Sequence, residues 1–166
     1  MEVEVVRSPR RRRTIQARRT GDCLRVMIPA SMSVADEERW VAEMVRRAER
    51  REDGQRIPLD QRASRLARRF DLPLPKDIQW VDNQVSRWGS CSPLGGKVRL
   101  SLRLARYPGW VLDYVIVHEL AHLAEPYHDE RFWSLVSRYP LAERARGYLM
   151  AKGDEPDDRQ GDGLVG

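Results

Sequence analysis

The fold is decided by the stretch Val115-Ile116-Val117-His118-Glu119-Leu120-Ala121-His122-Leu123. Apolar residues fill almost every position between Pro108 and this stretch, which predicts a largely buried helix that ends at Pro126. Two imidazoles and a carboxylate in a buried helix cost several kcal/mol unless partners satisfy them. The stretch therefore predicts a core helix whose polar residues need a partner.

A metal ion is the partner that these residue types favour. Residues four apart lie on one face of a helix, so His118 and His122 can point imidazole nitrogens at a single ion. Glu119 lies roughly a quarter-turn away and can act on a water beside the ion without binding the ion. The alternative is core histidines bonded to backbone carbonyls. All 3 histidines of the chain fall within residues 118–128, which favours the metal site.

Two residues compete as third ligand. Glu125 continues the helix face of His122, but the following Pro126 disfavours helical geometry at Glu125. His128 follows a bend that can fold the chain back beneath the metal. Three nitrogens plus one water form an accepted catalytic zinc set, so we prefer His128.

The ligand types also favour a particular metal. Imidazole suits zinc, whereas magnesium and calcium prefer clustered carboxylates. Zinc lowers the pKa of water towards about 7, and a neighbouring carboxylate can then take the proton. The sequence thus predicts a hydrolase with one zinc ion. The predicted ligands are His118, His122 and His128, and the predicted general base is Glu119.

Composition indicates a soluble globular protein. The chain is 41% hydrophobic and 33% charged, and no apolar run approaches the roughly 18 residues that cross a bilayer. Its start lacks the pattern of a signal peptide. Cys23 and Cys91 form no Cys-x-x-Cys pair, which excludes a four-cysteine zinc site and a disulfide scaffold. We therefore expect a cytoplasmic protein with no membrane partner.

Positive charge gathers near the N-terminus. The net charge is +5, and arginines crowd the first twenty residues against only Glu2 and Glu4. Basic patches attract nucleic acid, although many are only solvated surface, so DNA or RNA contact through these arginines is a candidate property. The arginines are Arg7, Arg10, Arg11, Arg12, Arg13, Arg18 and Arg19.

Hydrophobic periodicity predicts three regions. Residues 1–33 alternate as strands and form a basic β unit, expected to be a small antiparallel one. Residues 34–152 form a helical connector and the core. Residues 153–166 form an acidic tail that we expect to be disordered. Within the core region we expect helices over 33–51, 58–70, 108–125, 129–139 and 141–150, and strands over 78–81, 85–88 and 98–102.

Several motifs in order give the chain a resemblance to a known family. They are Arg87-Trp88-Gly89-Ser90-Cys91-Ser92, a glycine turn, the strand of residues 97–102, Tyr107-Pro108, the helix of residues 111–123, His128, and Phe132-Trp133. This series resembles the YgjP-like metal-dependent hydrolases. Arg7-Ser8 and the arginines that follow are similar to the N-terminal hairpin of that family.

The resemblance implies a compact α+β fold of the zincin type. In that fold a small antiparallel sheet lies over the His-Glu-x-x-His helix with backing helices, next to an N-terminal β-hairpin or meander. It implies kinship with SprT-like and WLM proteases, a protein or peptide substrate, and the same roles for His118, His122, His128 and Glu119. The chain departs from the family at Ser101, where members often carry asparagine, and at Pro126-Tyr127.

Three functions follow as hypotheses. The first is a zinc metalloprotease that cuts exposed protein segments. The second is a hydrolase of a non-peptide substrate such as a nucleotide. The third is a nucleic-acid-associated module with a structural metal, although structural zinc usually has four protein ligands and only three good ligands occur here.

Two interpretations of Arg87–Ser92 stay open. Either Arg87 or Ser90 contacts substrate, and the strand pairs with an extended peptide, or the segment is a tight turn. In the second case Trp88 packs in the core and Gly89 permits an awkward backbone. We expect Cys91 to be a buried small residue because no spare histidine exists to activate it.

Overall fold

The computed structural model describes residues 1–84 and 86–152. By contacts, the chain divides into two compact units at Asp53 and Gly54, and each is described by itself. The predicted domain boundary after residue 33 stays a prediction, and the predicted tail of residues 153–166 lies outside the described residues. In the described part of the chain, no helix is long and apolar enough to cross a membrane.

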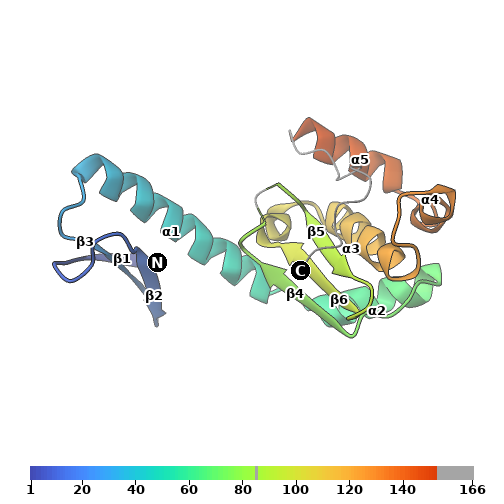
Figure 1. The fold of residues 1–166 in the computed structure, drawn as a ribbon, viewed down its shortest axis with the longest axis horizontal. Coiled ribbons are helices and arrows are strands. Elements are labelled where there is room, and N and C mark those ends of the chain that lie inside the picture. The colour runs from blue at the N-terminus through green and yellow to red at the C-terminus, as the bar shows by residue number, and fades with distance from the viewer. Residues whose placement is uncertain (85, 153–166) are drawn as a thin grey trace. The chain divides into compact units, whose positions relative to one another are not determined.

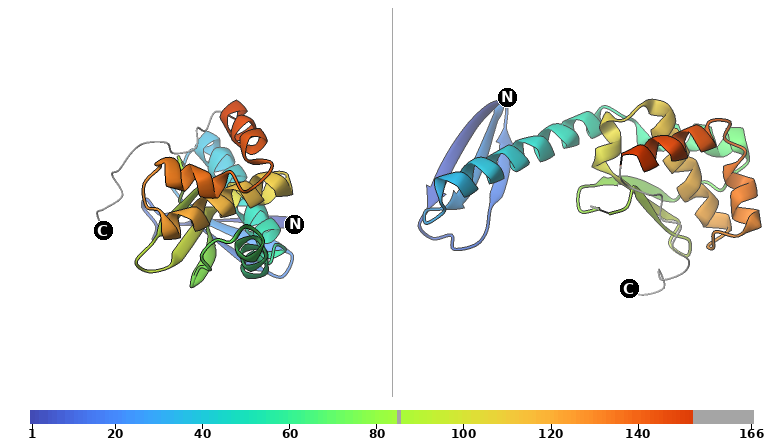
Figure 2. Two further views of the ribbon diagram at one scale, coloured as in Figure 1. Left: turned by 90° about the vertical axis from the view of Figure 1, so that its right-hand side faces the viewer. Right: turned by 90° about the horizontal axis from the view of Figure 1, so that it is seen from above.

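The first unit is a three-stranded sheet covered by one helix (Figure 1). Its elements are β1 (Glu2–Ser8), β2 (Gln16–Thr20), β3 (Cys23–Pro29) and α1 (Val34–Gln55). Alternate residues of β3, namely Leu24, Val26 and Ile28, are buried and pack with Met44 of α1. Figure 2 shows α1 running along the sheet.

The pairing of this sheet differs from the antiparallel unit expected. The strand order is β1-β3-β2, and β1 runs parallel to β3 whereas β2 runs antiparallel to it. A period of two predicts strands but does not say which strands pair. The most deeply buried strand takes the centre: Val26 is 0% exposed, whereas Val3 and Val5 on the edge strand β1 are 38% and 37% exposed.

The second unit has the α+β composition that the sequence predicts. Residues 153–166 aside, its elements are α2 (Leu59–Phe70), β4 (Asp77–Val81), β5 (Gly89–Ser92), β6 (Lys97–Ser101), the 3-10 helix η1 (Leu102–Arg106), α3 (Gly109–Ala124), α4 (Glu130–Val136) and α5 (Ala142–Ala151). The predicted helices therefore occur within a few residues of their expected ends. The helix that we expected over residues 33–51 continues to Gln55.

The sheet of the second unit is mixed, not antiparallel as expected. Its order is β4-β6-β5, with β4 parallel and β5 antiparallel to the central strand β6. Val98 and Leu100 of β6 are 0% exposed, so burial again selects the central strand. Lys97 and Arg99, which alternate with them, are exposed, so one face of the sheet meets the helices and the other meets solvent.

One predicted strand begins later than expected. We expected a strand over residues 85–88, but β5 begins at Gly89; Val85 lies outside the described residues. Trp88 just before it is 4% exposed and belongs to the core. A large buried side chain gives the same apolar signal in a strand and in the turn that precedes one.

Helix α3 is the centre of the second unit. Ten of its residues are buried, from Val111 through Ala121, because α2, α4, α5 and the sheet all pack against it. It begins after Pro108 and ends at Glu125, whose backbone is extended (φ −126°, ψ 100°) as expected before a proline. The polar residues of the deciding stretch therefore lie in the middle of the core.

Candidate metal centre

The structure brings the three predicted ligands together. His118 and His122 lie on α3, and His128 lies in the loop between α3 and α4. Their ligand atoms all lie within 4.8 Å of one another. The Nε2 atom of His128 is 3.0 Å from that of His122 and 3.2 Å from that of His118.

These distances fit a metal of the predicted kind. A tetrahedral zinc with Zn–N bonds of about 2.0–2.1 Å holds its nitrogen ligands roughly 3.3 Å apart. The nitrogen separations of 3.0 and 3.2 Å are close to this value. Three lone pairs directed at one point are poorly satisfied by one another, and a divalent cation accepts all three.

A backbone contact fixes which nitrogen of His122 is available. Its Nδ1 lies 3.2 Å from the carbonyl oxygen of Glu125, and a carbonyl only accepts, so Nδ1 carries the proton. The Nε2 atom then keeps its lone pair and faces the other two histidines. Orientation of a ligand imidazole by a backbone carbonyl is typical of metal sites.

His118 is held in the neutral form that a metal needs. Burial lowers the pKa of His118 well below the ordinary 6.5, and nearby His122, His128 and Arg146 lower this pKa further. A neutral imidazole is the ligand form, so no proton has to leave before a metal binds.

Aromatic side chains form one wall of the cluster. Phe132 of α4 is 0% exposed and stacks on the His122 ring with 4.3 Å between ring centroids. Trp133 stacks on His128 at 5.7 Å. Asp129 caps α4, since its Oδ1 accepts from the Phe132 backbone N–H at 2.9 Å. This cap therefore holds the first turn of the helix that carries the aromatic wall.

Glu119 lies on the side of α3 that faces strand β5. It is 6% exposed. A Cβ atom built on Gly89 would lie 2.5 Å from its Oε1, so the strand passes directly over the carboxylate. Burial, with the charge of Glu119 as the smaller cause, raises the pKa of Cys91 to about 12. Cys91 is therefore protonated at neutral pH, and it is partly buried, less than the sequence led us to expect.

Glu125, the other candidate for third ligand, contacts His122 through its backbone. Its backbone carbonyl accepts a hydrogen bond from Nδ1 of His122. Among the described residues, the group that could hold a metal ion consists of His118, His122 and His128, without Glu125. The proline that follows ends the helix, as the sequence predicts, and lets the chain return with His128.

The segment Arg87–Ser92 has features of both open interpretations. Trp88 is buried, as the turn interpretation expects. Gly89 does not have a positive φ, so the awkward backbone of that interpretation is wrong. Ser90 lies on the opposite side of β5 from Gly89 and accepts from the Gln84 side chain at 2.7 Å. Whether Arg87 or Ser90 contacts substrate stays a prediction.

Sequence reasoning missed one charged neighbour of the site. Arg146 of α5 lies over the Trp133 ring, 4.7 Å from its centroid, and it lowers the pKa of His118. It is separated from the histidines by α4 and a loop, and no local motif marks it.

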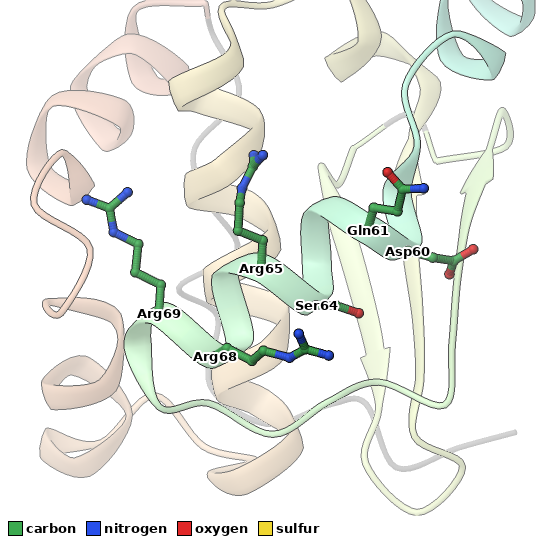
Figure 3. Close-up of a pocket in the computed structure, with 6 residues that line it drawn as sticks. All are labelled: Asp60, Gln61, Ser64, Arg65, Arg68 and Arg69. Atoms are coloured by element: carbon green, nitrogen blue, oxygen red, sulfur yellow. The ribbon is translucent and has the colours of Figure 1, made fainter.

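An open hollow of about 700 Å³ lies elsewhere, along α2 (Figure 3). Arginine side chains dominate it, and it contains no histidine. Its lining residues are Asp60, Gln61, Ser64, Arg65, Arg68 and Arg69. Exposed arginines at helical spacing are typical of a solvated helix face, and the hollow has none of the chemistry of the cluster.

An α+β domain that gathers three imidazole nitrogens beside a buried glutamate defines a metal-dependent hydrolase of the metallopeptidase type. The family model described as YgjP-like, metallopeptidase domain matches residues 8–151. The chain therefore belongs to the YgjP-like family. This confirms the family, the α+β class and the metal-dependent hydrolase predicted from sequence.

One solved structure is similar in fold. It is the crystal structure of the metallopeptidase zymogen of Pyrococcus abyssi abylysin, with a TM-score of 0.52 and 19% sequence identity. The match covers 58% of this chain and 96% of that chain. No curated protein matches the chain. The similarity shows that this chain contains a fold like that of nearly the whole abylysin chain.

Proposed function

We propose that this protein is a zinc-dependent endopeptidase in which His118, His122 and His128 hold the ion and Glu119 is the general base. The observation that carries the proposal is the convergence of three Nε2 atoms, 3.0 and 3.2 Å apart in two pairs, next to a buried glutamate. Three protein ligands leave a position open, which is typical of catalytic and not of structural zinc.

The chemistry divides between the ion and the chain. A zinc ion supplies Lewis acidity, which acidifies water and polarises a carbonyl. The Glu119 carboxylate accepts a proton from the attacking water as the new carbon–oxygen bond forms. It then returns this proton to the departing amine nitrogen as the carbon–nitrogen bond breaks. The carboxylate ends the cycle ionised, as it began.

Strand β5 supports a peptide as substrate. Among the described strands it lies at the edge of the order β4-β6-β5 and pairs with β6, and it passes over Glu119. An extended peptide can add to an exposed edge through main-chain hydrogen bonds. Such a peptide would run beside the general base, which fits the protein substrate and the SprT-like kinship that the sequence resemblance implies.

The test compares substrates and variants side by side. Casein and a peptide library should be cut by the zinc-loaded protein, and a nucleotide panel should not. Glu119→Gln should keep one zinc per chain and abolish cleavage. His118→Ala, His122→Ala and His128→Ala should each lose zinc. Turnover of nucleotides alone would replace the peptidase by the non-peptide hydrolase, and bound zinc without any turnover would favour the structural-metal module.

We also propose contact with DNA or RNA, which the exposed arginines of the N-terminal unit support. Arg7 and Arg19 are committed to ion pairs with Glu37 and Glu52 of α1, whereas Arg10, Arg12, Arg13 and Arg18 are exposed. Binding of an oligonucleotide should weaken steeply with salt, and the slope should shrink when the exposed arginines become glutamine. An unchanged slope would remove the arginines as the contact.

We also propose a cytoplasmic location. Cys23 and Cys91 are free thiols in the structure, which suits a reducing compartment. Cell fractionation with an antibody against the protein would test this location.

A further inference from the structure

Glycine at position 89 has a spatial reason, not a conformational one. Gly21 and Gly96 are the described glycines with positive φ, and Gly89 is not among them. Alanine can therefore adopt the backbone of residue 89 without strain. A Cβ atom there would instead lie 2.5 Å from Oε1, 2.8 Å from Cδ and 2.8 Å from Cγ of Glu119.

Glu119 itself has little room to give way. The contact involves Cγ and Cδ as well as the terminal oxygen, so turning the carboxylate alone does not relieve it. The residue is 6% exposed and belongs to the most buried helix of the unit.

Strand β5 is also unable to retreat. The Ser101 N–H donates to the Trp88 carbonyl at 2.8 Å, and the Arg103 guanidinium donates to the Arg87 carbonyl at 3.3 Å. That guanidinium also lies over the buried Trp88 ring, 4.0 Å from its centroid. Ser101 and Arg103 thus hold the two residues just before Gly89 through three contacts.

We propose that Gly89 is a positioning residue for Glu119: its missing side chain lets β5 close over the carboxylate and hold it in one place. This inference rests on the proposed function, in which Glu119 is the general base. The three atoms nearest to a Cβ at residue 89 all belong to Glu119 and none to the three histidines. A side chain at position 89 should therefore displace the base and leave the metal site intact.

The first experiment separates catalysis from metal binding. Gly89→Ala should keep one zinc per chain and a similar KM for a peptide, while kcat falls on the order of 100-fold, as expected for a catalytic group displaced by about 1 Å. Gly147→Ala is the matched control, because a Cβ there meets nothing within 4 Å, and it should keep full activity. Wild-type kcat in Gly89→Ala would overturn the inference.

A second experiment does not depend on activity. Glu119→Ala removes the three atoms that lie nearest to a Cβ at residue 89. Gly89→Ala should therefore lower Tm on the order of 10 °C in the wild-type background and much less in the Glu119→Ala background, both without metal. An equal loss in both backgrounds, or failure to fold in both, would overturn the inference.

The two proposals fail in different ways. If Glu119→Gln still cuts peptides, Glu119 is not the base and the proposed function fails, even if the two residues remain coupled in Tm. If Glu119→Gln is inactive while Gly89→Ala has normal kcat and no coupling in Tm, the inference alone fails.

Discussion

The cap of helix α4 gives a prediction whose size follows from the structure. Asp129 has an extended backbone, and its Oδ1 accepts from the Phe132 N–H at 2.9 Å. The helix has only 7 residues, so this hydrogen bond is a large part of what holds its first turn. Asp129 is itself exposed, so its truncation to alanine opens no cavity.

The expected loss is about 1 kcal/mol for Asp129→Ala, the usual cost of replacing a capping aspartate by alanine. For a domain of roughly 100 residues, this corresponds to a drop in Tm of about 4–8 °C. Asp129→Asn keeps an acceptor oxygen and ranks with aspartate as a cap, so it should stay within a few tenths of a kcal/mol of wild type.

The measurement is thermal unfolding followed by circular dichroism, with metal removed from every sample by chelation. Metal-free protein is needed because bound zinc would stabilise the native state and hide the difference. If Asp129→Asn loses as much as Asp129→Ala, the effect comes from charge and not from the cap. If neither loses stability, the hydrogen bond to Phe132 does not hold α4.

Three further predictions concern metal, thiol and core. Saturating zinc at about 100 times its Kd should raise Tm by about 10 °C or more, and His122→Ala should show no such rise; a shift in that variant would place the ion elsewhere. In a Cys23→Ser background, iodoacetamide should label native Cys91 slowly at pH 8 and faster only towards pH 12, because burial raises the pKa of this thiol to about 12 and the thiolate is the reactive form. Rapid native labelling at pH 8, as fast as in urea, would contradict this. Leu120→Ala, at a position 0% exposed, should cost about 2–5 kcal/mol in urea unfolding, whereas Leu94→Ala, at a position 96% exposed, should stay within about 0.5 kcal/mol; similar losses would show that the burial assigned to Leu120 is wrong.

The sequence predicted the elements better than their partners. Alternation at Leu24, Val26 and Ile28 identified a strand, and the structure places these residues in the core of the first unit. Periodicity within one segment has no information about which segment lies beside it. The parallel pairing of β1 with β3, and of β4 with β6, was therefore missed.

The site shows the same division between local and distant information. His118, His122 and His128 were found because helix geometry and a proline bend relate them along the chain. Gly89 lies on β5 and Arg146 lies on α5. Both are far from the histidines in sequence, and no sequence spacing predicts such contacts. The sequence analysis named Gly89, but only the structure shows that the Glu119 side chain occupies the space beside it.

The contrast between a contiguous ligand set and a distant strand over the base has a practical consequence. The three histidines span residues 118–128, so the proposed ligands all come from one short segment of the chain. Closure of β5 over Glu119 instead joins this helix to a strand from an earlier part of the chain. Metal content would therefore report on the proposed ligand segment alone, whereas active-site titration would also report on the position of β5 over Glu119.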